Sequence, residues 1–259
     1  MKKFLILLLT LALTLSLTAC GGDTTGGESA SDDGSAEGTT YSFTVGTNTA
    51  EDSVNQLLAE KFKELIEERS DGAVTVTIYS NGALGGDAEL TESCIAGTVD
   101  FIIGMTGSLV NYIPEAALFD LPNAFPDLAT AREVLDGPIL ADLQAAYEAG
   151  GLKLFGYADS GFRVMSSSKA VRQMSDFSGI KIRTMENPNH IAYWQALGAN
   201  PTPSDFSELY MSLEQGTLDA QENPYDLIVA NKLYEPQSYI IETNHLLHTL
   251  NMVGSKATY

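Results

Sequence analysis

The sequence is poor in positive charge. Its 259 residues include 14 Lys and Arg against 34 Asp and Glu, which gives a formal net charge of −20 at pH 7. Binding to nucleic acid needs clustered Lys and Arg to neutralise phosphates, and such a cluster is missing. The composition therefore excludes nucleic acid as a partner, while a small ligand would respond mainly to the few charged groups close to it.

Motifs for catalysis are also missing. There is no Gly-x-Ser-x-Gly sequence, and no Lys-Ser or Lys-Thr pair follows the glycine-rich stretch 82–87. The three histidines are His190, His245 and His248, and the three-residue spacing of the last two is too weak a signal to predict a metal site. We interpret them as surface or capping residues. We therefore predict that the protein is not an enzyme and that it binds neither a metal ion nor a cofactor.

The N-terminus predicts export. Two lysines precede the almost wholly apolar run Phe4 to Leu17, which is shorter than a typical membrane-spanning helix. The run ends in Leu17-Thr18-Ala19-Cys20, which resembles the bacterial lipobox. We therefore expect a signal peptide over residues 1–19 and a lipid on Cys20, which would anchor the protein outside the cytoplasm. The alternative is a plain secretory signal that happens to carry a cysteine.

A linker follows the predicted anchor. Residues 20–40 contain Gly, Ser, Thr, Asp, Glu and Ala but no large apolar side chain, so this segment cannot bury enough surface to fold. We expect a flexible acidic tether and a folded part that begins near Tyr41. Only Cys94 remains after Cys20, so we predict no internal disulfide and interpret Cys94 as a small core residue.

Apolar periodicity in the folded part alternates between strand and helix patterns. Predicted strands cover 41–47, 73–79, 99–104, 152–158, 161–165, 180–183 and 238–242, and predicted helices cover 54–69, 87–96, 128–149 with an interruption at Gly137-Pro138, 187–197, 205–215 and 223–234. We expect Asp87 and Ser204 to cap helices. We also expect Pro201-Thr202-Pro203 to break the helix that begins at 187. This order predicts two successive α/β units with a ligand crevice between them.

Several blocks of the folded part resemble a known family. Gly161-Phe162-Arg163, Gly179-Ile180-Lys181-Ile182-Arg183 and Asp219-Ala220-Gln221-Glu222-Asn223-Pro224 are similar to signature blocks of the solute-binding proteins of TRAP transporters (the DctP type). Supporting similarities, in chain order, lie at 80–87, 97–101, 201–206 and 235–244. The resemblance runs from about Tyr41 to the last residue.

The resemblance implies a two-lobed periplasmic-binding-protein (Venus-flytrap) fold of the α/β class. It places lobe I at residues 41–161 and 249–259 and lobe II at residues 162–248, with a chain truncated at its C-terminus relative to the family. It also implies that Arg183 pairs with a ligand carboxylate. A guanidinium suits this role because its planar fork matches a carboxylate and it stays charged when desolvated. The alternative for Arg183 is a salt bridge to an internal acid.

The resemblance implies five further ligand-binding residues. Arg163 is a second cleft arginine or an interdomain salt bridge, and Asn223 is a cleft amide or a helix cap. Phe206 is a pocket wall or plain core. The first lobe would contribute Asn48 and Asp87. Met105 stands where some family members carry a polar or acidic residue, which suggests a less polar wall.

The function implied is the solute-binding component of a TRAP-type secondary transporter. It would capture a small organic acid outside the cytoplasm, as a lipid-anchored monomer, and deliver it to a membrane permease. The alternatives are an ABC-type or sensor-associated periplasmic binding protein, an extracellular hydrolase, and a purely structural surface lipoprotein. The sequence does not distinguish a dicarboxylate from a sugar acid, a keto acid or an amino acid.

Overall fold

The computed structural model describes residues 39–258. The predicted signal peptide, Cys20 and nearly all of the predicted tether lie outside these residues. Within the described part, no helix combines the length and apolar character that crossing a membrane requires.

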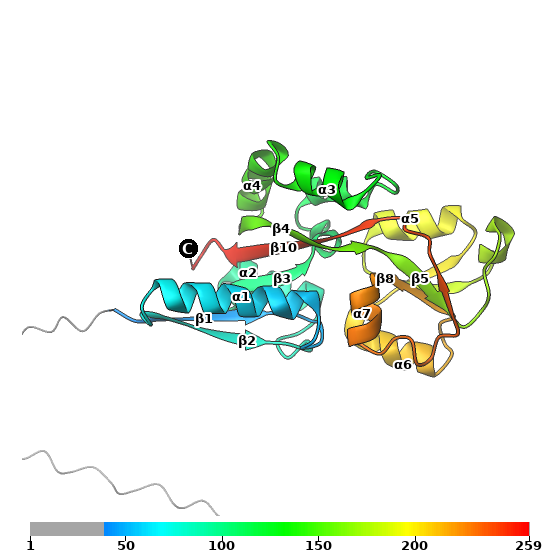
Figure 1. The fold of residues 1–259 in the computed structure, drawn as a ribbon, viewed down its shortest axis with the longest axis horizontal. Coiled ribbons are helices and arrows are strands. Elements are labelled where there is room, and N and C mark those ends of the chain that lie inside the picture. The colour runs from blue at the N-terminus through cyan, green and yellow to red at the C-terminus, as the bar shows by residue number, and fades with distance from the viewer. Residues whose placement is uncertain (1–38, 259) are drawn as a thin grey trace, which may run out of the picture. The chain divides into compact units, whose positions relative to one another are not determined.

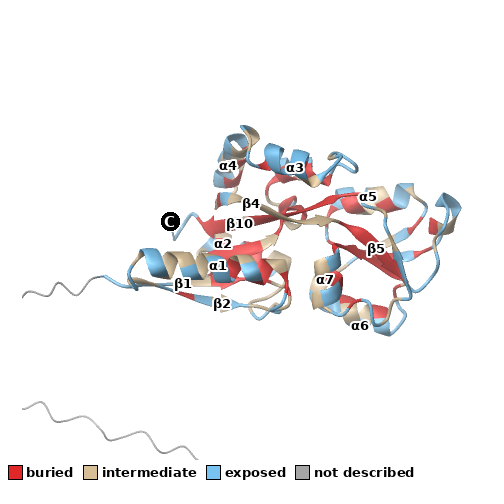
Figure 2. Ribbon diagram, viewed as in Figure 1, coloured by how far each residue is buried: buried red, intermediate tan, exposed pale blue. Residues whose placement is uncertain are grey.

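The first of two five-stranded sheets has the order β2-β1-β3-β10-β4 (Figure 1). β1 pairs in parallel with β2 and β3, whereas β10 runs antiparallel to both β3 and β4. Its strands are β1 (Tyr41–Gly46), β2 (Val74–Tyr79), β3 (Phe101–Met105), β4 (Leu152–Phe162) and β10 (Leu247–Ser255). All residues of β10 except Met252 are buried, as its central position between two strands requires (Figure 2).

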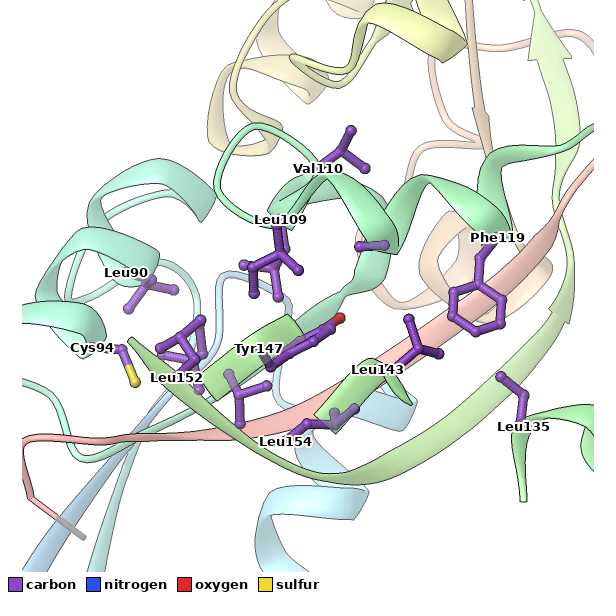
Figure 3. Packing of buried hydrophobic residues seen from close by; sticks show 14 of the residues in the cluster. Leu90, Cys94, Leu109, Val110, Phe119, Leu135, Leu143, Tyr147, Leu152 and Leu154 are labelled. Atoms are coloured by element: carbon purple, nitrogen blue, oxygen red, sulfur yellow. The ribbon is translucent and has the colours of Figure 1, made fainter. Parts of the chain in front are cut away.

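Four helices accompany this sheet: α1 (Val54–Arg69), α2 (Asp87–Ala96), α3 (Leu128–Leu135) and α4 (Ile139–Ala149). α1 begins where the Ser53 hydroxyl accepts a hydrogen bond from the Gln56 amide, and its apolar stripe packs on β1, β2 and β3. A larger core surrounds the fully buried Tyr147 and includes Cys94, as predicted (Figure 3). We call this sheet and its helices the first unit.

The second sheet has the order β7-β6-β8-β5-β9. β6 pairs in parallel with β7 and β8, and β5 runs antiparallel to β8 and β9. Two smaller apolar clusters, one of them around Trp194, form its core. The second unit comprises β5 (Val164–Ser167), β6 (Lys181–Thr184), β7 (Asn200–Pro203), β8 (Ala220–Asn223) and β9 (Tyr239–Ile241) with α5 (Pro188–Ala196), α6 (Leu209–Glu214) and α7 (Tyr225–Ala230).

The chain passes between the sheets at Arg163, which separates β4 from β5, and again between β9 and β10. The Arg163 amide donates to the Leu246 carbonyl at 2.8 Å, so the two crossings are joined by a backbone hydrogen bond. The mixed α/β class predicted from the periodicities is confirmed. Short 3-10 helices complete the fold: η1 (Thr106–Leu109), η2 (Pro114–Asp120), η3 (Met174–Phe177) and η4 (Phe206–Glu208).

Some local predictions are wrong. The helix before Pro201 does end, as expected, but Pro201 and Pro203 then lie in β7, a strand that was not predicted; it forms the edge of the second sheet, where a missing amide donor costs little. Gly86, not Asp87, is the N-cap of α2, which leaves the Asp87 side chain free of a capping role. Likewise Asp205, not Ser204, caps the turn before α6 by accepting from the Ser207 amide.

Candidate functional site

A small cavity lies where the two units meet. The first unit contributes one set of walls through its loop after β1, α1, α2, β3 and β10. The second contributes the other through β6, β8, η4 and α7. The residues that line it are Asn48, Thr49, Asn55, Asp87, Met105, Arg183, Met185, Phe206, Asn223, Leu227 and His248.

Arg183 is a buried cation at this cavity. It is only 2% exposed, and it donates through Nε and Nη2 to the Ser204 carbonyl at 2.9 and 2.6 Å. Its guanidinium carbon lies 5.8 Å from the centre of the Phe206 ring, which gives it a cation–π contact. Among the described residues no carboxylate lies within 4.0 Å of Arg183. Burial lowers the pKa of Arg183 to about 10, so the side chain stays charged at neutral pH.

Asp87 lines the same cavity from the first residue of α2. Burial raises the pKa of its carboxyl to about 6, although the nearby positive charge of Arg183 opposes this shift. Asp87 and Arg183 also line a second small pocket, which extends to Ser204 and Asp205. The cavity thus contains one cation and one carboxyl that ionises near neutrality.

Arg163 lies behind the cavity rather than in its wall. Its side chain is 0% exposed and forms an ion pair with Glu222, with Nη2 at 2.9 Å from Oε1. The same guanidinium donates to His248 Nδ1 at 2.6 Å and to Asn223 Oδ1 at 3.1 Å. Two cavity residues are therefore oriented by Arg163, whose own charge is already neutralised by Glu222.

Glu222 is the centre of a buried polar cluster. Although burial raises its pKa, the positive charge of Arg163, a hydrogen bond with His245 and the nearby His190 hold it well below the usual value. His245 Nε2 lies 3.1 Å from Glu222 Oε2, and His190 Nε2 lies 3.1 Å from Asp120 Oδ1.

The prediction that the three histidines are surface or capping residues is wrong, because all are at most 2% exposed. In the part of the chain that the structure describes, no group of three or more His, Cys, Asp or Glu side chains is arranged to hold a metal ion.

Five of the six predicted ligand-binding residues line one cavity: Asn48, Asp87, Arg183, Phe206 and Asn223. Asn223 does not cap α7, whose N-cap is Pro224; its amide donates to Gln221 Oε1 at 2.6 Å. No sequence pattern singled out the lining residues Thr49, Asn55, Met185, Leu227 and His248. Their neighbours along the chain form ordinary helix and strand patterns, and only the tertiary fold brings them to the cavity.

Comparison with known proteins gives the family. The model of the bacterial extracellular solute-binding protein family 7 (DctP) matches residues 45–259. The 2,3-diketo-L-gulonate-binding periplasmic protein YiaO of Escherichia coli K12 is 33% identical over 84% of this chain and 67% of its own length. A solute-binding protein of Verminephrobacter eiseniae is 37% identical over 83% of this chain, which spans 64% of that relative.

Solved structures agree with this assignment. A TRAP periplasmic solute-binding protein of Polaromonas sp. JS666, bound to D-erythronate, superposes with a TM-score of 0.82 at 35% identity, over 85% of this chain and 72% of that one. The sugar-acid-binding protein of Advenella mimigardefordensis, in complex with galactonate, superposes with a TM-score of 0.83 at 35% identity, over 85% of this chain and 71% of that one. The predicted two-lobed periplasmic-binding-protein fold is confirmed, and the chain belongs to the DctP family of bacterial extracellular solute-binding proteins.

Proposed function

We propose that this chain captures a small organic acid in the cavity between its two units, by an ion pair between Arg183 and the ligand carboxylate, and delivers it to a TRAP-type permease. The observation that supports this most directly is the buried Arg183 guanidinium, which faces a cavity and has no carboxylate within 4.0 Å among the described residues. A desolvated cation that makes no direct ion pair is stabilised by an anion that enters beside it.

Ligand binding would favour closure of the two units. The first and the second unit contribute different walls of the cavity, so an acid held by Arg183 would also contact first-unit residues such as Asn48 across it. Contacts that exist only when both walls meet the ligand stabilise the closed form, which is what ligand-driven closure requires. The permease would then recognise this form. We also propose that the protein works outside the cytoplasm, anchored by a lipid on Cys20, and acts as a binding protein without catalysis.

Substitution of Arg183 tests the ion pair. Arg183→Ala is expected to weaken binding of an organic acid by at least about 30-fold, because a buried charge-assisted pair is lost. Arg183→Lys keeps the charge but not the planar fork and should fall between this variant and the wild type. Isothermal titration calorimetry with sugar acids and four-carbon dicarboxylates measures the effect.

Arg132 offers a matched control. It is an exposed arginine that pairs with Asp159 at 2.7 Å, away from the cavity. Arg132→Ala should bind like the wild type. Native-like affinity in both Arg183 variants would contradict the proposed site, and the absence of any organic-acid binding by the wild type would contradict the proposed function.

A further inference from the structure

Two polar atoms in the first-unit wall of the cavity have no protein partner among the described residues. They are His248 Nε2 and Asn55 Oδ1, both on side chains that line the cavity and are 2% exposed. Buried polar atoms in folded proteins are nearly always hydrogen-bonded, so two such atoms at one cavity indicate a ligand that completes them.

The hydrogen-bonding role of His248 follows from its partner. Its Nδ1 lies 2.6 Å from Nη1 of Arg163, and a guanidinium nitrogen can only donate. Nδ1 is therefore the acceptor, and the hydrogen of the neutral ring is on Nε2. Burial and the adjacent Arg163 charge hold the pKa of His248 well below its usual value, which keeps the ring neutral. His248 thus offers the cavity one uncharged N–H donor.

Asn55 offers the complementary group. Its Nδ2 donates to the Ile103 carbonyl at 3.4 Å, which orients the amide and leaves Oδ1 as an acceptor. A hydroxyl group both donates one hydrogen bond and accepts others, whereas an ionised carboxylate only accepts. A wall with one free donor and one free acceptor therefore suits hydroxyl groups better than a second carboxylate.

The charges of the cavity point the same way. Arg183 is the one cationic side chain among the residues described as its lining, and Asp87 is the one acidic side chain. Arg163 cannot serve as a second cation because its charge is taken by Glu222, with both side chains fully buried. A dicarboxylate would bring a second carboxylate into a cavity that offers it no second cation and that already contains Asp87, at a cost in desolvation and repulsion.

From this geometry we infer that the cavity selects hydroxylated monocarboxylic acids over dicarboxylates, with His248 and Asn55 as the residues that bind the ligand hydroxyl groups. This inference rests on the proposed function, since Arg183 holds the single carboxylate. His248 then acts as a specificity-determining residue, and Arg163 positions it from behind.

Acids matched in length test the selectivity. We would titrate the purified protein with D-erythronate, succinate and butyrate, which share four carbons, and with galactonate, adipate and hexanoate, which share six. Within the series that binds, the hydroxylated acid should bind at least about tenfold more tightly than either analogue. If the dicarboxylate binds most tightly and the binding depends on Arg183, the inference is wrong while the proposed function stands. If no acid binds, the proposed function itself fails.

Two substitutions at His248 distinguish its role as a hydrogen-bond donor from its role in packing. His248→Gln can place an amide nitrogen near the position of Nε2, whereas His248→Asn can offer an acceptor only near Nδ1. We expect His248→Asn to lose about tenfold in affinity for the hydroxylated acid with little change for the unsubstituted acid, and His248→Gln to recover most of the loss. An equal loss for both ligands would show that His248 serves packing alone and would overturn its assignment.

Asn55→Leu provides an independent variant, because it removes the acceptor without touching Arg163. The same ligand-selective loss is expected. Urea denaturation of each variant without ligand checks that it is folded. If His248→Asn does not fold, the ranking of the matched acids and the selectivity of Asn55→Leu decide the question, and an unchanged preference in Asn55→Leu would count against the inference.

Discussion

Arg163 and Arg183 are equally buried but differ in how their charges are balanced. Arg163 has a carboxylate in direct contact, whereas Arg183 is bonded to a backbone carbonyl and an aromatic ring. An ion pair that is already complete can orient its neighbours, and a cation with only neutral partners is available to an anion. The signature blocks indicated both arginines as ligand-binding residues, but the side-chain contacts assign them different places.

Asp87 should make stability depend on pH. Its pKa is about 6 in the folded protein against 3.8 for the unperturbed carboxyl, so ionisation destabilises the folded state. This penalty is complete above pH 6, shrinks as the pH falls towards 3.8, and vanishes below it. Asp87→Asn is therefore expected to raise the free energy of unfolding of the ligand-free protein by about 1–3 kcal/mol at pH 8 and to have little effect below about pH 4.

Urea denaturation at pH 8, 6 and 4 measures this effect. Asp219 is a control of opposite sign: although burial raises its pKa, the Lys169 ammonium and the Lys181 amide lower it overall. Asp219 therefore stabilises the folded state above pH 3.8, and Asp219→Asn should be less stable than the wild type at pH 8. If Asp87→Asn were also destabilised at pH 8, the assigned direction of the Asp87 shift would be incorrect.

Among the elements, α5 joins the two units through its first turn. Its N-cap Asn187 accepts from the Asn189 amide at 2.8 Å, and its Nδ2 donates to the Gly107 carbonyl and to Asp120 Oδ2 at 2.8 and 2.7 Å. Gly107 and Asp120 belong to η1 and η2 of the first unit. One buried side chain thus starts a helix and holds that helix against the other unit.

Asn187→Ala is expected to lower the free energy of unfolding by about 2–4 kcal/mol, because it removes a cap and two hydrogen bonds to buried acceptors of the first unit. Asn187→Ser keeps a capping oxygen but not the donor, so it should recover about 1 kcal/mol. Denaturant titration measures both values. Asp127 caps the exposed start of α3, and no hydrogen bond from it to the second unit is described. Asp127→Ala should therefore lower the free energy of unfolding by only about 1 kcal/mol. Equal losses in Asn187→Ala and Asp127→Ala would mean that the interunit bonds contribute nothing.

The sequence predicted elements with strong local signals and missed those set by tertiary contacts. α1 was expected at its observed bounds because residues 54–69 carry a long amphipathic pattern. β7 was missed because prolines disfavour strands, and only its edge position makes Pro201 and Pro203 acceptable. The burial of His190 and His245 was missed for a similar reason: their partners Asp120 and Glu222 lie far from them in the sequence.

At the scale of the molecule, two opposing electrostatic effects act on an anionic ligand. The formal net charge of −20 repels an organic acid at a distance, whereas Arg183 attracts it at short range inside the cavity. Salt screens charges separated by more than about 10 Å at 0.1 M but hardly affects a buried pair. The association and dissociation rates should therefore respond differently to ionic strength.

We expect the association rate constant of a sugar acid to rise about two- to tenfold between 20 and 500 mM NaCl, because the long-range repulsion is screened. The dissociation rate should change much less, because it depends on contacts inside the closed cavity. Stopped-flow measurement of the intrinsic fluorescence of Trp194 follows both rates, provided that binding alters its emission; competition with a labelled acid serves otherwise. An uncharged polyol of the same length is the control and should show no salt dependence. An association rate that falls with salt would mean that a locally positive field at the cavity outweighs the acidic surface, so the net charge would not govern capture of the ligand.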